Sequence, residues 1–165
     1  MKHILNTLVL NKPGVLAHVA GMFAARAFNI DSLAVGRTDD PTLSRMTIVV
    51  SGTDKVVEQV RKQLAKIVAV VKVQEYASQD VVAQDLMLIS VSCPPEKRPE
   101  IIALIEMFDG KVADIASKSI IVELTGPESK LEAFIDACRP YGIKNVVRTG
   151  TVAMARQSRT AKSDE

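Results

Sequence analysis

Two stretches of this chain carry the same order of strand and helix signals, and this repetition limits the fold more than any other feature. The first stretch opens with an apolar run at residues 4–10 and a Pro-Gly turn at residues 11–14. From Val15 the spacing becomes helical. The apolar stripe consists of Leu16, Val19, Ala20, Phe23 and Ala27. We expect this helix to end near Asn29, since asparagine tolerates the left-handed conformation found at helix C-termini.

The rest of the first stretch completes one compact pattern. Residues 30–38 read as extended, residues 39–42 have turn composition, and residues 43–51 alternate between apolar and polar side chains. A second helix should start near Asp54, and residues 70–76 should form the last strand. The predicted order is βαββαβ.

The second stretch repeats that order after a polar segment. Strands are expected at residues 86–92, 111–116, 119–125 and 143–152, and helices before and after the middle pair. One register relates the two halves: Gly52, Val57, Val60 and Leu64 align with Gly126, Leu131, Phe134 and Cys138. We therefore predict domains at 1–76 and 86–153, a linker at 77–85, and a disordered tail at 154–165.

These elements predict an α+β protein made of two tandem ferredoxin-like units. Two helices cannot bury their stripes against each other alone, so they should pack on one face of a four-stranded antiparallel sheet. The other face and the sheet edges would stay available to a partner. Units this small are marginally stable, which favours a homodimer.

Composition excludes several classes of protein. The net charge is only +2, so no large footprint for nucleic acid is expected. Cys93 and Cys138 form no CxxC pair and read as small buried side chains in a reduced compartment. Neither a signal peptide nor a membrane span is evident, so we expect a cytoplasmic protein without membrane contact.

No catalytic group can be assembled from the sequence. His3 and His18 have no partnering motif, phosphate-binding loops are absent, and histidine and cysteine are too few for a zinc site. Asp39 and Asp40 are better explained by a turn than by a metal or an acid–base pair. The same fold serves RNA-binding domains, but residues 4–10 and 43–50 lack the aromatic side chains that stack bases. It also serves acyl-phosphate hydrolases, but residues 11–14 lack their arginine.

The first loop is the best candidate for a ligand site. Gly14 opens the first helix, whose leading N–H groups lack internal partners and attract a carboxylate. Asn11 and Asn29 each offer a donor and an acceptor, as the ammonium and carboxylate of an amino acid require. Val9, Val15 and Ile30 could provide an apolar wall. A plain turn at Asn11 and a plain helix cap at Asn29 remain the alternative.

Two sequence motifs carry a family resemblance. Residues 11–16 together with residues 28–30 resemble an ACT domain, the amino-acid-sensing module. Residues 29–33 followed by residues 38–48 resemble the small subunit of acetolactate synthase, also called acetohydroxyacid synthase. Length and two-part organisation agree with that family over nearly the whole chain. Asn11 departs from the wider ACT pattern, in which aspartate is frequent, but asparagine is usual in this subfamily.

The resemblance implies a non-catalytic regulatory subunit with no cofactor of its own. Thiamine diphosphate, Mg²⁺ and FAD would belong to the large catalytic subunit, which this chain would bind, activate and make sensitive to valine. The ACT domains would pair side by side, with N-terminal ACT and C-terminal ACT-like units in each chain. Carried onto this sequence, the valine site uses the following residues: Asn11, Gly14, Val15 and Leu16 from one chain, and Asn29 and Ile30 from its neighbour.

Two other functions are compatible with the pattern. One is a free-standing tandem-ACT sensor that regulates transcription, which would bind a DNA-binding protein or nucleic acid instead of a large enzyme. The other is a small enzyme on a ferredoxin-like scaffold, which the missing catalytic groups disfavour.

Overall fold

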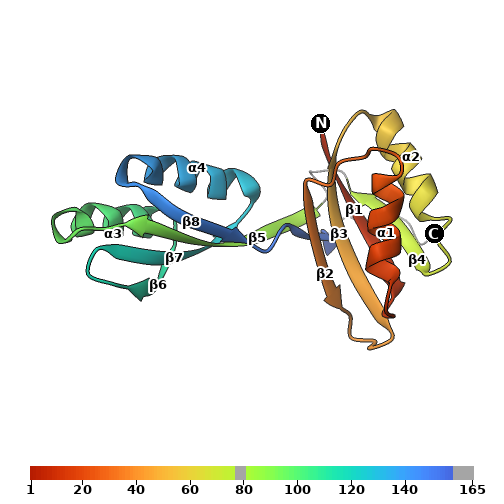
Figure 1. The fold of residues 1–165 in the computed structure, drawn as a ribbon, viewed down its shortest axis with the longest axis horizontal. Coiled ribbons are helices and arrows are strands. Elements are labelled where there is room, and N and C mark those ends of the chain that lie inside the picture. Colours follow the sequence, from red (N-terminus) through yellow and green to blue (C-terminus); the bar gives the residue numbers. More distant parts are fainter. Residues whose placement is uncertain (77–80, 158–165) are drawn as a thin grey trace. The chain divides into compact units, whose positions relative to one another are not determined.

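The computed structural model describes residues 1–76 and 81–157 and divides into two compact units. The first comprises Met1–Val82 with the chain from Thr151 onward, and the second comprises Ala83–Gly150. Each unit carries a βαββαβ motif, which confirms the predicted α+β class (Figure 1).

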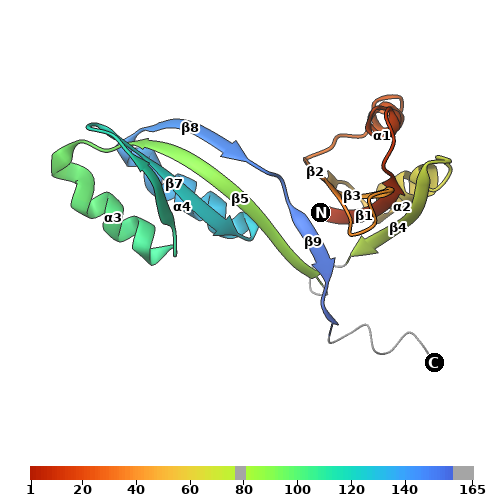
Figure 2. The same ribbon diagram turned by 90° about the horizontal axis from the view of Figure 1, so that it is seen from below.

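The first unit is a four-stranded antiparallel sheet in the order β2-β3-β1-β4. Its elements follow the chain as β1 (Lys2–Leu10), α1 (Val15–Ala24), β2 (Ser32–Arg37), β3 (Leu43–Ser51), α2 (Asp54–Leu64) and β4 (Val70–Tyr76). Both helices cover one face of the sheet, as Figures 1 and 2 show. Apolar side chains from that face and from both helices form a single core, including Leu5, Val9, Phe23, Ile48, Val60 and Leu64.

Helix α1 ends earlier than predicted. Its last residue is Ala24, and the left-handed residue is Ala27 (φ 54°), not Asn29. The Phe28 N–H bonds the Phe23 carbonyl at 3.0 Å, and the Ala27 N–H bonds the Ala24 carbonyl at 3.1 Å. These two bonds define a Schellman motif, which the edge-on contact of the Phe23 and Phe28 rings (6.5 Å between centroids) closes. The five-residue spacing of Phe23 and Phe28 was therefore the sequence signal that marks the end of this helix.

The second unit repeats this design with a five-stranded sheet, in the order β6-β7-β5-β8 with β9 pairing β5 off this path. Its elements are β5 (Val81–Ser92), α3 (Arg98–Met107), β6 (Lys111–Ile115), β7 (Ser119–Gly126), α4 (Glu128–Cys138) and β8 (Ile143–Arg148), with β9 (Val152–Ala155) following. The aligned positions of the repeat behave alike, because Val57, Val60, Leu64, Leu131, Phe134 and Cys138 are all buried. A Cβ on Gly52 would meet the Val56 side chain, and one on Gly126 would meet the Lys130 side chain.

The domain boundaries differ from those predicted. Residues 81–85, assigned to the linker, are the start of β5, and the strand expected at 143–152 stops at Arg148. Gly150 has a φ of 84°, a left-handed conformation that suits glycine, and the chain then forms β9. Residues 154 and 155 of the predicted tail belong to β9, whereas residues 77–80 and 158–165 lie outside the described residues.

Strand β9 pairs with β5 but is grouped with the first unit, where it covers part of the sheet face that we expected to be free. The Asn6 side-chain amide donates to the Ala153 carbonyl at 3.1 Å, and the Thr151 N–H donates to the Ser32 hydroxyl at 2.9 Å. Asn6 is only 2 % exposed although it lies opposite the helices. Both atoms of its amide are used, because its oxygen accepts from Arg45 at 2.7 Å.

The core of the second unit depends on one large aromatic side chain. Phe134 is fully buried and lies 5.2 Å from Phe108, ring centroid to ring centroid. Phe134→Ala should lower the free energy of unfolding by about 3–5 kcal/mol, since it removes apolar contacts and leaves a cavity. Urea denaturation, with hydrogen exchange of β5 and β7 to locate the effect, measures this loss.

Met107→Ala is the matched control, because Met107 lies on the neighbouring helix and is 79 % exposed. It should change stability by about 0.5 kcal/mol or less. Equal effects of the two substitutions would contradict this description of the core.

Candidate functional site

Among the described residues no side chain caps the start of α1, and the same holds for α2, α3 and α4. The N-cap residue of α1 is Gly14, with φ 84° and ψ −12°, and it makes no side-chain cap hydrogen bond. The first turn of α1 contains no acidic residue, whereas α2, α3 and α4 each carry one. The leading N–H groups of α1 and its dipole are thus left to favour an external carboxylate.

Gly14 also leaves open space above this terminus. A Cβ built at Gly14 would have no heavy atom within 4 Å. The conformation is left-handed, so glycine is the residue that adopts it without strain. The main chain at Gly14 is therefore open to close approach.

Asn11 is held by the β2–β3 hairpin. Its main-chain N–H donates to the Thr42 carbonyl at 2.7 Å, and its side-chain Nδ2 donates to the Pro41 carbonyl at 2.9 Å. The oxygen Oδ1 is left as the acceptor that could meet an ammonium group. Sequence reasoning treated the loop and the hairpin as separate features, although pairing of Leu10 with Leu43 places them at one end of the sheet.

The apolar residues of the predicted site divide into two groups. Val9 and Val15 are 1 % and 8 % exposed and belong to the core, so they are not the expected wall of an open site. Leu16, two residues after Gly14, is 45 % exposed. Val15 contributes only its main chain there, with its N–H 3.4 Å from the Lys12 carbonyl.

Asn29 and Ile30 lie at the other end of α1. The exposed Asn29 donates from Nδ2 to the Asp31 carboxylate at 2.8 Å, and Asp31 also accepts from the Ser51 hydroxyl. Ile30 is half-buried against the core. A helix of ten residues spans about 15 Å, so one chain does not bring these residues to Gly14 (Figure 1).

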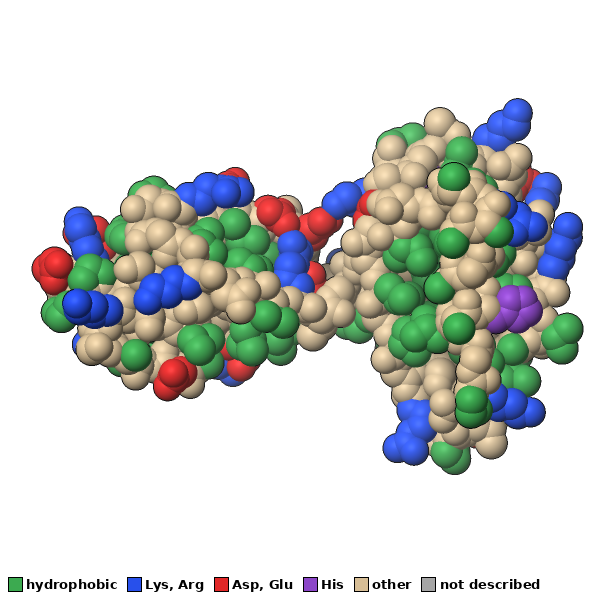
Figure 3. All heavy atoms as spheres, viewed as in Figure 1, with side chains coloured by type: hydrophobic (Ala, Val, Ile, Leu, Met, Phe, Trp, Pro, Cys, Tyr) green, Lys and Arg blue, Asp and Glu red, His purple; other side chains and the backbone are tan. Residues whose placement is uncertain are grey.

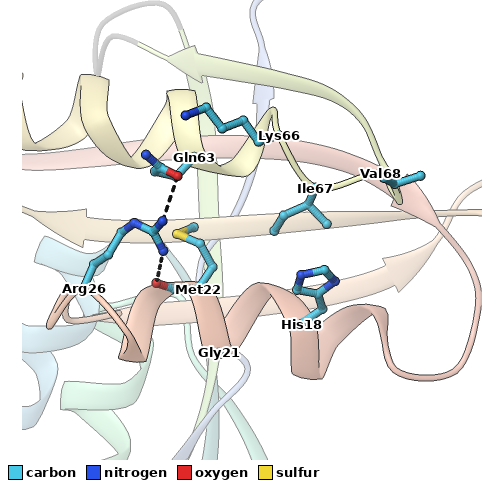
Figure 4. Close-up of a pocket in the computed structure, with 8 residues that line it drawn as sticks. All are labelled: His18, Gly21, Met22, Arg26, Gln63, Lys66, Ile67 and Val68. Atoms are coloured by element: carbon cyan, nitrogen blue, oxygen red, sulfur yellow. Dashed lines mark hydrogen bonds between the residues drawn. The ribbon is translucent and has the colours of Figure 1, made fainter.

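A hollow of about 450 Å³ lies between α1 and α2, but it contains none of these residues. Met22 and Ile67 line it, and the Arg26 guanidinium donates to the Gln63 side chain at 2.9 Å and to the Met22 carbonyl (Figure 4). A second hollow of about 380 Å³ lies beside Asn6, Arg45 and β9. Neither hollow contains a paired nucleophile and base, so neither has the form of an active site.

The turn at residues 39–42 is explained by backbone chemistry. The Asp40 carboxylate accepts from the Thr42 hydroxyl at 2.7 Å and from the Thr42 N–H at 2.8 Å. These two bonds hold the pKa of Asp40 below its usual value. Over residues 1–76 and 81–157, no group of three or more histidine, cysteine or acidic side chains could hold a metal ion.

On the face that Figure 3 shows, acidic side chains lie mainly on the second unit, and lysine and arginine side chains are scattered over both units between apolar patches. His18 is exposed, while His3 lies 3.0 Å from the Glu75 carboxylate. Among the described residues, no helix is long and apolar enough to cross a membrane.

Comparison with known proteins identifies the chain in two steps. Residues 5–72 match the model of the "AHAS small subunit-like ACT domain", and residues 84–157 match that of the "small subunit of acetolactate synthase". The first unit is therefore an ACT domain. With the full-length similarity described next, the chain belongs to the acetolactate synthase small subunit family.

The similarity extends over nearly the whole chain. A "probable acetolactate synthase small subunit" of Archaeoglobus fulgidus is 55 % identical over 156 residues, covering 94 % of this chain and 98 % of the relative. The acetolactate synthase small subunit of Bacillus subtilis is 43 % identical, covering 94 % and 91 %. The crystal structure of the Thermotoga maritima small subunit matches with a TM-score of 0.87 at 43 % identity, covering 94 % and 98 %.

Membership settles the broad class that the sequence predicted. The chain is a non-catalytic regulatory subunit, and the family implies association with a catalytic large subunit, where the cofactors reside. It favours this class over both the transcriptional sensor and the small enzyme.

The reactivity of the cysteines tests the prediction that both are small buried side chains. Cys93 and Cys138 are free and buried, as predicted. Burial raises the pKa of the Cys138 thiol to about 11, so roughly one thiol in 10³ is ionised at pH 8. Iodoacetamide should modify native Cys138 at least about 10²-fold more slowly than the urea-unfolded chain, as followed by mass spectrometry. Rapid native alkylation would show that this helix opens readily.

Proposed function

We propose that the chain binds valine, or a closely related branched-chain amino acid, between two ACT domains and thereby inhibits the acetolactate synthase large subunit. Thiamine diphosphate, Mg²⁺ and FAD would serve the large subunit. The observation that carries the proposal is the uncapped start of α1 at Gly14, free of acidic residues and open to close approach. Family membership supplies the catalytic partner.

A two-fold dimer through β2 would complete the site. β2 is an edge strand, and its pairing with β3 puts Ser32 opposite Val49 and Arg37 opposite Ser44. The end of β2 therefore lies at the same end of the sheet as Gly14, and its beginning lies near Asn29. If two β2 edges pair antiparallel, the beginning of one strand meets the end of the other.

This arrangement unites residues that a single chain keeps apart. Asn29 and Ile30 of one protomer would approach the loop at residues 11–14 of the other. The carboxylate of valine would face the N–H groups after Gly14, and its ammonium would face Oδ1 of Asn11. The exposed Leu16 and the partner's Ile30 are the apolar groups within reach of a short aliphatic side chain.

The ligand then stabilises one arrangement of the paired domains. A coupling of about 1–3 kcal/mol between valine binding and the state of the large subunit is enough for useful feedback inhibition. A ligand of this size should bind with a dissociation constant between roughly 1 µM and 1 mM.

Gly14→Asp tests the carboxylate site. It places a negative charge where the ligand's carboxylate would bind, so valine inhibition should disappear while activation of the large subunit persists. Acetolactate formation by the reconstituted complex, measured across a valine titration, gives both quantities.

Gly14→Asn is the matched control, because it imposes the same left-handed strain and nearly the same volume without the charge. Asparagine also tolerates this conformation better than most residues. It should retain more valine sensitivity than Gly14→Asp. A Gly14→Asp complex that stays fully inhibited by valine would show that the site lies elsewhere.

Asn29→Ala tests the contribution of the second protomer. Removing this amide should weaken valine binding by about 5–10-fold, corresponding to one hydrogen bond of roughly 1 kcal/mol or slightly more. Isothermal calorimetry on the full chain measures the change. An unchanged valine titration would remove Asn29 from the site.

A further inference from the structure

The hairpin tip, residues 39–42, is bonded to Asn11 of the proposed valine site, and all four of its residues are exposed. We propose that this tip is the surface that contacts the catalytic large subunit and transmits valine occupancy to it, with Asn11 as the positioning residue that joins tip and site. The inference rests on the proposed valine site.

The first observation is that Asn11 contacts the tip with both its donors. The main-chain N–H and the side-chain Nδ2 bond successive carbonyls, those of Thr42 and Pro41. The acceptor Oδ1 stays available to the ligand. Because the amide is planar, an ammonium that fixes Oδ1 also fixes the direction of Nδ2, so ligand and tip order the same side chain.

The second observation is that the tip is internally braced and can move as one piece. Asp40 accepts both bonds from Thr42, the Thr38 hydroxyl donates to the Asp40 carbonyl at 2.9 Å, and the Leu43 N–H donates to that same carbonyl at 3.0 Å. A displacement at Pro41 would therefore be carried to all four residues instead of being absorbed within the turn.

Comparison with the second unit shows which of the two Asn11 hydrogen bonds is common to both units. There the Cys93 N–H bonds the Lys118 carbonyl at 2.9 Å, and these residues occupy the places of Asn11 and Thr42. The main-chain bond is thus common to both units. The buried thiol of Cys93 cannot replace the exposed amide of Asn11, so the bond to Pro41 is an addition of the ACT unit.

The large subunit is the partner that we assign to this surface. All four tip residues are exposed, and Asp39 presents a carboxylate there. A binding partner with N–H donors or a cationic side chain would complement it. The catalytic large subunit is the macromolecule that family membership supplies, and it is the molecule whose activity must respond.

Asp40→Ala is the main test, in the full chain reconstituted with the large subunit. It removes the acceptor that braces the tip but leaves Asn11, Gly14 and Leu16 intact. Hydrogen exchange should quicken at the Thr42 and Asn11 amides. Valine should bind the free chain within about threefold of its normal affinity by calorimetry, since less than 1 kcal/mol is at stake there.

The decisive quantity is the coupling between valine and the large subunit. It is the ratio of valine dissociation constants for the free chain and for the complex, normally about 5–150. With Asp40→Ala this ratio should fall to roughly one, and valine inhibition should fall with it. Asp40→Asn keeps an acceptor oxygen and should restore most of the coupling.

Arg98→Ala is the matched control from the second unit. The Arg98 guanidinium joins α3 to its own hairpin through the Ala116 and Ser117 carbonyls, both at 3.1 Å. Its removal loosens the corresponding contact without touching the ACT unit. Exchange should quicken at that hairpin while valine coupling stays normal.

The outcomes separate this inference from the proposed function. Normal coupling in Asp40→Ala, despite faster exchange at Thr42, overturns the role of the tip and leaves valine binding standing. Unchanged exchange at Asn11 overturns the mechanical link. Loss of valine binding by Asp40→Ala makes the tip part of the binding site and also overturns transmission. Absence of heat with the unaltered chain refutes the valine site itself.

Discussion

Each unit of this protein has to bury two helical stripes against one face of one small sheet, and the rest of its architecture follows from that constraint. The stripe of α2, with Val57, Val60 and Leu64, cannot be covered by α1 alone. Packing both helices on the same face leaves the opposite face and the edge strands without helical cover. In the first unit, β9 takes up part of that face, and the edge strand β2 stays open for the dimer proposed above.

Much of the fold was predictable because strand and helix periods differ sharply in this chain. β3 and β4 have the predicted bounds, and the repeat register placed Val57, Phe134 and their equivalents in two cores. The predicted end of α1 was wrong because the Schellman motif that ends the helix uses Ala27, and alanine has no preference for the left-handed conformation. The sequence also did not predict β9 as a separate strand, since its four residues are all apolar and show no alternation of apolar and polar side chains.

The candidate site was predictable only in its parts. The backbone role of Gly14 follows from residue type, and its φ of 84° agrees with it. The direction of a side chain depends on strand register, so the burial of Val9 and Val15 and the attachment of Asn11 to Pro41 emerged only from the structure. Asn29 illustrates a further limit, because its proposed role depends on a second copy of the chain.

The grouping of β9 with the first unit makes that unit discontinuous along the chain. Unit 2 is inserted between β4 and the strand that caps Asn6, so two covalent connections link the units. A fragment ending at Tyr76 would lack the carbonyl of Ala153 and leave the amide of a buried asparagine without its acceptor. A truncated chain that keeps the whole first unit therefore needs two cuts, one after β4 and one before β9. A single cut after β4 removes the strand that lies over Asn6.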